Sequence, residues 1–287
     1  MFSMKYSIII PAHNEEIHLK DALSSVLRQT LQPSSVIVVN DNSDDATEGI
    51  IDEFTALNPI FQKLNIISSH LHMPGSKVVN AFKNGLDQLQ VDYDFLVKLD
   101  ADIILPDNYF EKIAAIFNNH PNVGIAGGIA YEQDESGEWK RNHPMDNDHV
   151  RGAFKSYKKT CFLAMGGLRN AMGWDTVDEL LAKFHGFDIH TDESLKVKHL
   201  RPIGKAYNKR AKLLQGKAMY TMRYGFPITL IASAKMAWKQ RKLKSLLDNL
   251  QGFFGAKKDK APFLVTEKEG DFIRDLRWKN IKGKLLG

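Results

Sequence analysis

The sequence has one cysteine, no long apolar segment and no low-complexity tract, and each of these absences excludes a class of protein. With Cys161 alone, an internal disulfide and a cysteine-rich zinc site are both excluded. No segment reaches the roughly eighteen apolar residues of a membrane-spanning helix. The nearest, Tyr224 to Trp238, is interrupted by Lys235, so we expect it to lie on a membrane at most. The composition, 43% hydrophobic and 25% charged, indicates a packed globular fold.

Two further signals are missing near the N-terminus. Met1 to Tyr6 leads directly into the apolar strand Ser7 to Ile10, without the basic start and longer apolar stretch of a signal peptide. Together with the single cysteine, this predicts a cytoplasmic protein, either free or peripheral on the inner face of the cell membrane. No glycine-rich phosphate loop follows the strand, which argues against dehydrogenases and nucleotidyltransferases.

The net charge of +5 is modest, but it is unevenly distributed along the chain. Acidic residues cluster before about Asp192 and basic residues dominate after it. This asymmetry predicts an anionic partner for the C-terminal part, such as a nucleoside diphosphate, an anionic membrane or a nucleic acid. We favour a membrane surface and expect no nucleic acid.

The first 130 residues alternate short apolar runs with segments of helical period, which predicts an α/β fold with a mainly parallel sheet flanked by helices. Expected strands are Tyr6 to Ile10, Val36 to Asn40, Leu64 to Ser68, Phe95 to Leu99 and Val123 to Ala130. Apolar stripes of helical spacing begin at Leu19, Ile50, Val78 and Phe110. We expect residues 133–151 to form a polar loop, residues after His199 to be helical and basic, and a small appendage to begin at Pro262.

Polar residues follow three of the expected strands, at the end where ligands bind in open α/β sheets. Asp100 and Asp102 end an apolar run with only Ala101 between them. Two such carboxylates suit Mg²⁺ or Mn²⁺ held against a diphosphate. The alternative is a solvated turn, in which aspartate is common.

Three motifs in this order and spacing resemble family 2 glycosyltransferases, which have the GT-A fold and invert the sugar's configuration. The motifs are Ser7-Ile8-Ile9-Ile10-Pro11-Ala12-His13-Asn14-Glu15, Val38-Val39-Asn40-Asp41-Asn42-Ser43-Asp44-Asp45 and Lys98-Leu99-Asp100-Ala101-Asp102. The resemblance covers roughly residues 5–204, about two-thirds of the chain. It implies a GT-A catalytic domain over residues 1–210, followed by a helical extension over residues 211–287.

The resemblance also implies a donor site. The residues it assigns to the nucleotide sugar are Pro11, His13, Glu15, Asp41, Lys77, Asp100 and Arg201, and those it assigns to the metal, Mn²⁺ or Mg²⁺, are Asp102 and His199. His13 would pack on the base, and the alternative is an ordinary loop histidine. Lys77 would contact donor oxygens, and the alternative is a solvated lysine at a helix start. Asp44, Asp45 and Thr47 are expected to begin the next helix as capping residues.

The acceptor side is carried by Gly166-Gly167-Leu168 and the acidic segment that follows it. In the family, an acidic pair at a helix start supplies the general base, and the spacing assigns this role to Asp175. The sequence departs from the pattern because Trp174 replaces the usual acid and a second pair, Asp178 and Glu179, follows. Asp178 is therefore the alternative base.

The predicted function is transfer of a sugar from a nucleoside diphosphate sugar, UDP by default, to an acceptor hydroxyl in cell-surface polysaccharide or glycoconjugate synthesis. A non-catalytic protein that binds nucleotide sugars or anionic surfaces is one alternative, and a nucleotidyltransferase is another. Apolar residues and a lysine and arginine cluster in residues 220–254 predict an interfacial helix on an anionic leaflet and a lipid-linked acceptor. The alternative is a helix packed on the catalytic domain with a solvated basic face.

Overall fold

A computed structural model describes residues 4–68, 76–142, 148–201 and 209–286 of the chain. The chain divides into two compact units. The sheet unit comprises Met1–His72, Lys77–Leu168 and His185–Ile203, and the helical unit comprises Met73–Ser76, Arg169–Phe184 and Gly204–Gly287. The helical unit thus includes a segment, 169–184, that lies within the range predicted for the catalytic domain.

The sheet unit is built on a nine-stranded sheet in the described part of the chain, in the order β3-β2-β1-β4-β8-β6-β9-β5, with β7 paired to β6. Its strands are β1 Tyr6–Ala12, β2 Ser35–Asp41, β3 Phe61–Ile66, β4 Phe95–Leu99, β5 Ile103–Ile104, β6 Val123–Gln133, β7 Trp139–Arg141, β8 Phe154–Lys158 and β9 Asp188–His199. The predicted parallel arrangement is found from β3 to β4. Beyond β4 the sheet is mixed, because β8 pairs antiparallel with both β4 and β6.

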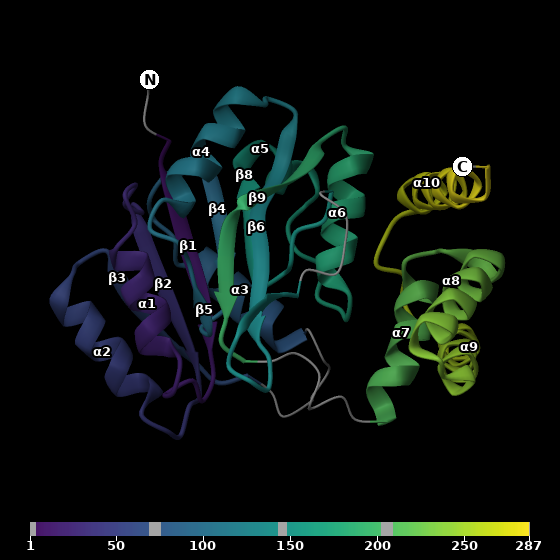
Figure 1. The fold of residues 1–287 in the computed structure, drawn as a ribbon, viewed down its shortest axis with the longest axis horizontal. Helices are drawn as coiled ribbons and strands as arrows, with labels where there is room; N and C mark the ends of the chain where they lie inside the picture. Colours follow the sequence, from purple (N-terminus) through teal and green to yellow (C-terminus); the bar gives the residue numbers. More distant parts are fainter. Residues whose placement is uncertain (1–3, 69–75, 143–147, 202–208, 287) are drawn as a thin grey trace. The chain divides into compact units, whose positions relative to one another are not determined.

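The connection from β3 to β4 sets the position of the site. The chain builds β2 and β3 on one side of β1 and then places β4 on the other side, so β1 lies between β2 and β4 (Figure 1). This reversal of strand order leaves a crevice at the carboxyl ends of β1 and β4, where ligands bind in open α/β sheets.

Each predicted helical stripe lies on a helix. The helices of the sheet unit are α1 Leu19–Leu27, α2 Thr47–Leu57, α3 Ser76–Asp87, α4 Tyr109–Asn119 and the short α5 Lys159–Ala164. In α1, for example, Leu19, Leu23 and Val26 are fully buried. In α2, by contrast, only Ile51 and Phe54 of the stripe are buried, whereas Leu57 is 68% exposed.

Two predictions of local structure were wrong. The third strand begins at Phe61 rather than Leu64, because Phe61 is buried and pairs with Val36, whereas Ile67 is 82% exposed. The segment predicted as a loop over residues 133–151 contains β7, which forms an antiparallel pair with the end of β6. Residues 143–147 of that segment lie outside the described residues.

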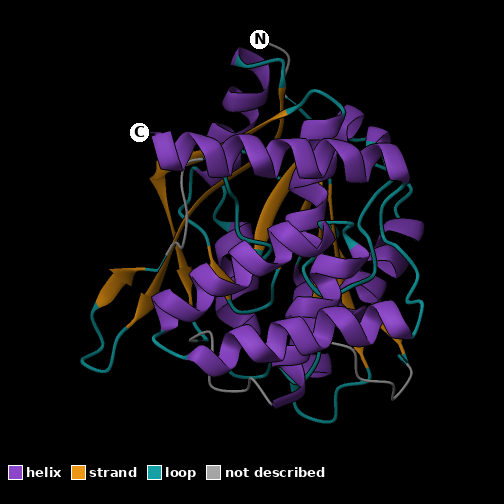
Figure 2. Ribbon diagram, turned by 90° about the vertical axis from the view of Figure 1, so that its right-hand side faces the viewer, coloured by secondary structure: helices purple, strands orange, loops and turns teal. Residues whose placement is uncertain are grey.

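The helical unit contains α6 Trp174–Phe184, α7 Lys209–Thr221, α8 Gly225–Gln240, α9 Leu243–Lys258 and α10 Glu267–Leu286. The segment after Pro262, expected to form a small appendage, contains the 20-residue helix α10, which ends at the label C in Figure 2. None of the helices in the described ranges is both long and apolar enough to span a bilayer.

Two glycines allow α7 and α9 to cross at close range. A Cβ added at Gly216 would lie 1.8 Å from the carbonyl oxygen of Asn249, and one added at Gly252 would lie 2.0 Å from that of Leu213. Both distances are far shorter than van der Waals contact, so each helix passes over a position where the other has no side chain. Neither glycine was singled out from the sequence.

We predict that Gly252→Ala destabilises the helical unit. The added methyl group would meet backbone that has no rotamer to change, and such overpacking should lower the free energy of unfolding by about 2 kcal/mol or more. Gly255→Ala is the matched control on the same helix, because no atom lies within 4 Å of an added Cβ there. It should be neutral or stabilising by up to about 1 kcal/mol. Urea denaturation followed by circular dichroism measures both, and equal effects would contradict the close crossing.

Candidate functional site

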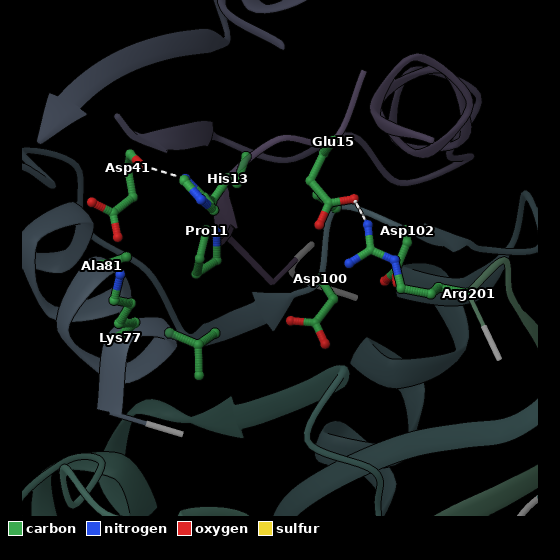
Figure 3. Close-up of a pocket in the computed structure, with 12 residues that line it drawn as sticks. Pro11, His13, Glu15, Asp41, Lys77, Ala81, Asp100, Asp102 and Arg201 are labelled. Carbon is green, nitrogen blue, oxygen red and sulfur yellow. Dashed lines mark hydrogen bonds and ion pairs between the residues drawn. The ribbon is translucent and has the colours of Figure 1, made fainter. Parts of the chain in front are cut away.

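A cavity of about 290 Å³ lies in the sheet unit, at the carboxyl ends of β1, β2 and β4 (Figure 3). This volume is near the lower end of the range for small-molecule sites. Its lining residues are Pro11, Ala12, His13, Glu15, Asp41, Lys77, Val78, Ala81, Asp100, Ala101, Asp102 and Arg201. The cavity therefore gathers every residue predicted to bind the nucleotide sugar, together with the predicted metal ligand Asp102.

One end of the cavity is formed by His13, Asp41 and Lys77 (Figure 3). The Nδ1 atom of His13 lies 2.7 Å from the backbone oxygen of Asp41. Since a carbonyl only accepts hydrogen bonds, Nδ1 carries the proton, and the Nε2 atom of a neutral ring is an acceptor. The Asp41 carboxylate is held in turn by the Ser68 amide, which donates to Oδ1 at 2.8 Å. Both groups thus have defined orientations.

The loops after β1 and β2 are tied to each other. The side-chain amide of Asn14 donates to Asp44 at 2.6 Å, and the Asp44 amide donates back to the Asn14 side chain at 3.0 Å. The Glu15 amide donates to the Thr47 hydroxyl at 2.7 Å. Asp45 accepts from the Thr47 amide at 2.9 Å just before α2, but the N-cap residue is Ala46, and Asp44 bonds Asn14 rather than capping the helix as predicted. These acids therefore shape the site without lining the cavity.

The other end of the cavity is formed by Asp100, Asp102 and Arg201 (Figure 3). Lys98, which is almost fully buried, forms an ion pair with Asp100. Arg201 hydrogen-bonds Glu15, and its Nε atom lies 3.9 Å from Asp102 Oδ2. The carboxylates are thus each faced by a cationic side chain.

His199 lies behind Asp102, with Nε2 3.4 Å from Asp102 Oδ2. The pairing of β5 with β9 sets this position, since Ile103 is the register partner of His199 and the Leu200 amide donates to the Asp102 carbonyl at 2.9 Å. The two predicted metal ligands, Asp102 and His199, are therefore neighbours although they are far apart in the sequence.

Asp102 supplies a carboxylate, the ligand type that suits Mg²⁺ and Mn²⁺, and His199 supplies an imidazole, a common metal ligand in proteins. The residues described here include no group of three or more histidine, cysteine, aspartate or glutamate side chains arranged to hold a metal ion. A metal at this position would take its other ligands from the substrate and from water. The Asp102 carboxylate fits such an arrangement, since Mg²⁺ is usually bound through one or two carboxylates and substrate phosphates.

Glu132 and Arg151 form a second layer that sequence reasoning missed. Glu132 Oε1 lies 3.3 Å from His199 Nδ1 and accepts a hydrogen bond from Arg151 at 2.7 Å. The Arg151 guanidinium also lies 3.4 Å from His199 Nδ1, so both side chains position the imidazole ring, whose Nε2 faces Asp102. No local motif marks Glu132. Its register pairing with His199 across β6 and β9 is the signal that places it here.

Burial and charge shift the pKa of several groups in the site. Burial raises the pKa of Glu15 to about 7, because the charges of Asp102 and Asp100 add to it and the opposing effect of Arg201 is smaller. Burial acts to lower the pKa of His199, but the hydrogen bond to Asp102 and the charges of Asp102 and Asp100 together outweigh it and raise the pKa. For Asp102, the same hydrogen bond and nearby cations outweigh burial and lower the pKa.

The two candidate bases lie in the helical unit, on α6, and are not among the residues that line the cavity. Asp175 is in the first turn and is half-buried, whereas Asp178 is 1% exposed. Trp174 is 6% exposed, consistent with a packed tryptophan. Their predicted catalytic role stays a prediction.

The comparison with protein families decides the family. The family described as "Glycosyl transferase family 2" matches residues 7–173, more than half of the chain. The chain belongs to glycosyltransferase family 2. The match includes the loops after β1, β2 and β4 that form the cavity, and it ends just before α6.

Among curated proteins, this family 2 chain is similar to an uncharacterized glycosyltransferase of Haemophilus influenzae, at 26% identity over 50% of the chain and 45% of that protein. It is also similar to the minor teichoic acid biosynthesis protein GgaB of Bacillus subtilis, at 24% identity over 97% of the chain and 29% of that protein. The chain thus spans less than half of the length of either relative.

Solved structures of low sequence identity share the fold of this family 2 chain. One is TarS residues 1–349 of S. aureus with UDP-GlcNAc, with a TM-score of 0.56, 18% identity, and coverage of 74% of this chain and 65% of that one. Another is the mannosyltransferase PcManGT of Pyrobaculum calidifontis with GDP-Man and Mn²⁺, with a TM-score of 0.59, 14% identity, and coverage of 90% and 76%. These likenesses confirm the predicted GT-A fold.

The raised pKa of Glu15 predicts a pH-dependent stability. Between about pH 4.5 and pH 7 the folded protein holds the Glu15 proton more tightly than the unfolded chain, so the free energy of unfolding should fall as the pH rises through this window. Relative to Glu15→Gln, the wild type should lose at most about 3 kcal/mol across it.

Urea denaturation of both proteins at several pH values measures this difference. In an Arg201→Ala background, which removes the group that lowers the Glu15 pKa, the decline should extend to higher pH. A stability difference that does not change with pH would contradict the raised pKa.

Proposed function

We propose that this chain is a metal-dependent, inverting glycosyltransferase that moves a sugar from a nucleoside diphosphate sugar, with UDP as the carrier, to an acceptor hydroxyl. The observation that carries the proposal is that one cavity is lined by Asp41, at the carboxyl end of β2, and by Asp100 and Asp102, just beyond β4, with β1 between these two parallel strands. Family membership supports the transferase activity.

The two ends of the cavity suit different parts of the donor. The end with His13 and Asp41 offers a ring face, and Asp41 is a carboxylate that accepts hydrogen bonds from a nucleobase edge. Lys77 and Arg201 are cations on the cavity wall and suit the diphosphate oxygens. Asp100, anchored by Lys98, suits the hydroxyls of the ribose or the transferred sugar. TarS with UDP-GlcNAc and PcManGT with GDP-Man support a nucleotide sugar as ligand.

Asp102 and His199 are the residues proposed to hold Mn²⁺ or Mg²⁺. When bound, the ion would neutralise negative charge on the departing nucleoside diphosphate. Glu132 would hold the His199 ring through Nδ1, with Nε2 directed at the same point as the Asp102 carboxylate. The Mn²⁺ in the PcManGT structure supports a divalent ion.

The proposed reaction is one in-line displacement. The acceptor hydroxyl oxygen attacks the anomeric carbon, the bond from that carbon to the diphosphate oxygen breaks, and the configuration inverts. Asp175 is the proposed base for the hydroxyl proton, with Asp178 as the alternative. The greater exposure of Asp175 supports this order, because a base must reach its substrate.

The names of the relatives support a role in building a cell-surface polymer. GgaB is a teichoic acid biosynthesis protein, and a poly-β-1,6-N-acetyl-D-glucosamine synthase of Staphylococcus epidermidis is also similar. We propose a saccharide acceptor carried on a lipid, with the enzyme peripheral on the inner face of the cell membrane. The basic and apolar composition of residues 220–254 supports this location.

We predict that Asp102→Asn removes metal-dependent nucleotide binding. Loss of a partner behind a metal ligand typically costs ten-fold to a hundred-fold in affinity, so loss of the ligand itself should weaken UDP binding with Mn²⁺ by at least about tenfold. Calorimetric titration of UDP, GDP and dTDP, with and without Mn²⁺, measures this and identifies the carrier. Asp107→Asn, an exposed aspartate paired with Arg28, is the control. No binding of any nucleotide to the wild type would refute the donor site.

The base can be assigned by comparing Asp175→Asn with Asp178→Asn. Loss of a general base typically slows the chemical step by about 10²–10⁴-fold. We expect this loss in kcat for Asp175→Asn, with UDP affinity unchanged, and a much smaller loss for Asp178→Asn. Because Asp178 is buried, its replacement could unfold the protein, and thermal unfolding of both variants checks that each remains folded. A large kcat loss in Asp178→Asn alone would reverse the assignment.

A further inference from the structure

The hairpin of α8 and α9 exposes large apolar side chains. On α8 and α9 these residues, called here the hairpin face, are Phe226, Leu230, Ile231, Trp238, Leu243, Leu247 and Phe254. Trp238 is 86% exposed, Leu243 81% and Leu247 66%. Such exposure of neighbouring large apolar groups is unusual for a surface that faces only water.

The members of the hairpin face lie in rows along the two helices. Phe226, Leu230 and Trp238 are separated by multiples of four residues, which places them along one side of α8. Leu243 and Leu247 repeat this spacing on α9. The two helices pack together (Figure 1). The rings of Phe226 and Phe254 lie 5.6 Å apart, so the rows meet at that end.

The opposite end of the hairpin face is the turn between the helices. Arg241 ends α8 in the left-handed conformation, with φ of 51°, and Trp238 and Leu243 flank it. Five exposed cationic side chains surround this turn, namely Lys235, Lys239, Arg241, Lys242 and Lys244. Residues 225–247 contain no aspartate or glutamate, and the next acid along the chain is Asp248. The turn therefore combines a positive charge with its most exposed apolar groups.

We propose that the hairpin face binds the surface of a bilayer rich in anionic lipids, with Trp238 and Leu243 in the interfacial layer and the five cations against the lipid headgroups. This inference deepens the proposed function, on which it rests for its lipid-linked acceptor. Tryptophan favours the boundary between headgroups and acyl chains, and clustered lysine and arginine are attracted to anionic leaflets. The same positive charge would oppose pairing of this face with a second copy of itself.

The experiment is flotation of the full-length protein with vesicles of phosphatidylcholine alone and of phosphatidylcholine with phosphatidylglycerol. We expect binding to the anionic vesicles, weakened by salt, with a blue shift of tryptophan emission that Trp238→Phe removes. Trp238→Ala combined with Leu243→Ser should weaken vesicle binding by about tenfold or more. Lys239→Gln combined with Lys242→Gln should weaken it on anionic vesicles. Leu57→Ser, at a leucine of α2 that is 68% exposed, is the control and should bind as the wild type does.

The proposal would be overturned if the wild type did not bind the anionic vesicles. It would also be overturned if the variant with both Trp238 and Leu243 replaced bound them as well as the wild type does. A third overturning result is a nucleic acid or a second copy of the chain that binds this face, with the same sensitivity to substitution, while vesicles do not. Calorimetry with UDP and Mn²⁺ on the same variants separates the two proposals. Failure of vesicle binding with intact UDP binding would refute the membrane surface alone, and the reverse result would refute the donor site alone.

Discussion

Mutual repulsion among carboxylates is the constraint around which the site is built. Asp100, Asp102 and Glu15 meet at one edge of the sheet, where burial makes ionised groups costly unless they are paired. Lys98, His199 and Arg201 lie against them, and each comes from a strand or from its end. The mixed half of the sheet is therefore part of the site, because β9 places His199, and the segment that follows it places Arg201, against the acid Asp102 beyond β4.

The sequence predicted the parallel half of this architecture because its signals are local. The strands β1, β2 and β4 are continuous apolar runs, and the polar segments that follow them line the cavity. The start of the edge strand β3 was predicted three residues too late, because only Phe61 within it is buried and the apolar pattern is weak. The extent of β9 and the hairpin of β7 depend on pairing with β6, which leaves no local pattern.

The same distinction applies to individual side chains. Asp41, Asp44 and Asp45 follow one strand and look alike in the sequence, yet only Asp41 lines the cavity while the others tie two loops together. Glu132 was missed although it contacts His199, because the two are 67 residues apart and meet only through strand register. Family resemblance identified the residues that lie in sequence motifs, whereas Glu132 and Arg151 could be identified only from the three-dimensional structure.

The hydrogen bonds between the loops after β1 and β2 have a thermodynamic consequence. Asn14, Glu15, Asp44 and Thr47 are joined by side-chain hydrogen bonds before any ligand arrives, and His13 is bonded to the backbone of Asp41. A nucleotide entering the cavity would contact side chains whose conformations are already restricted by these hydrogen bonds. Little of the intrinsic binding energy is then consumed in ordering the protein, and more of it appears as affinity.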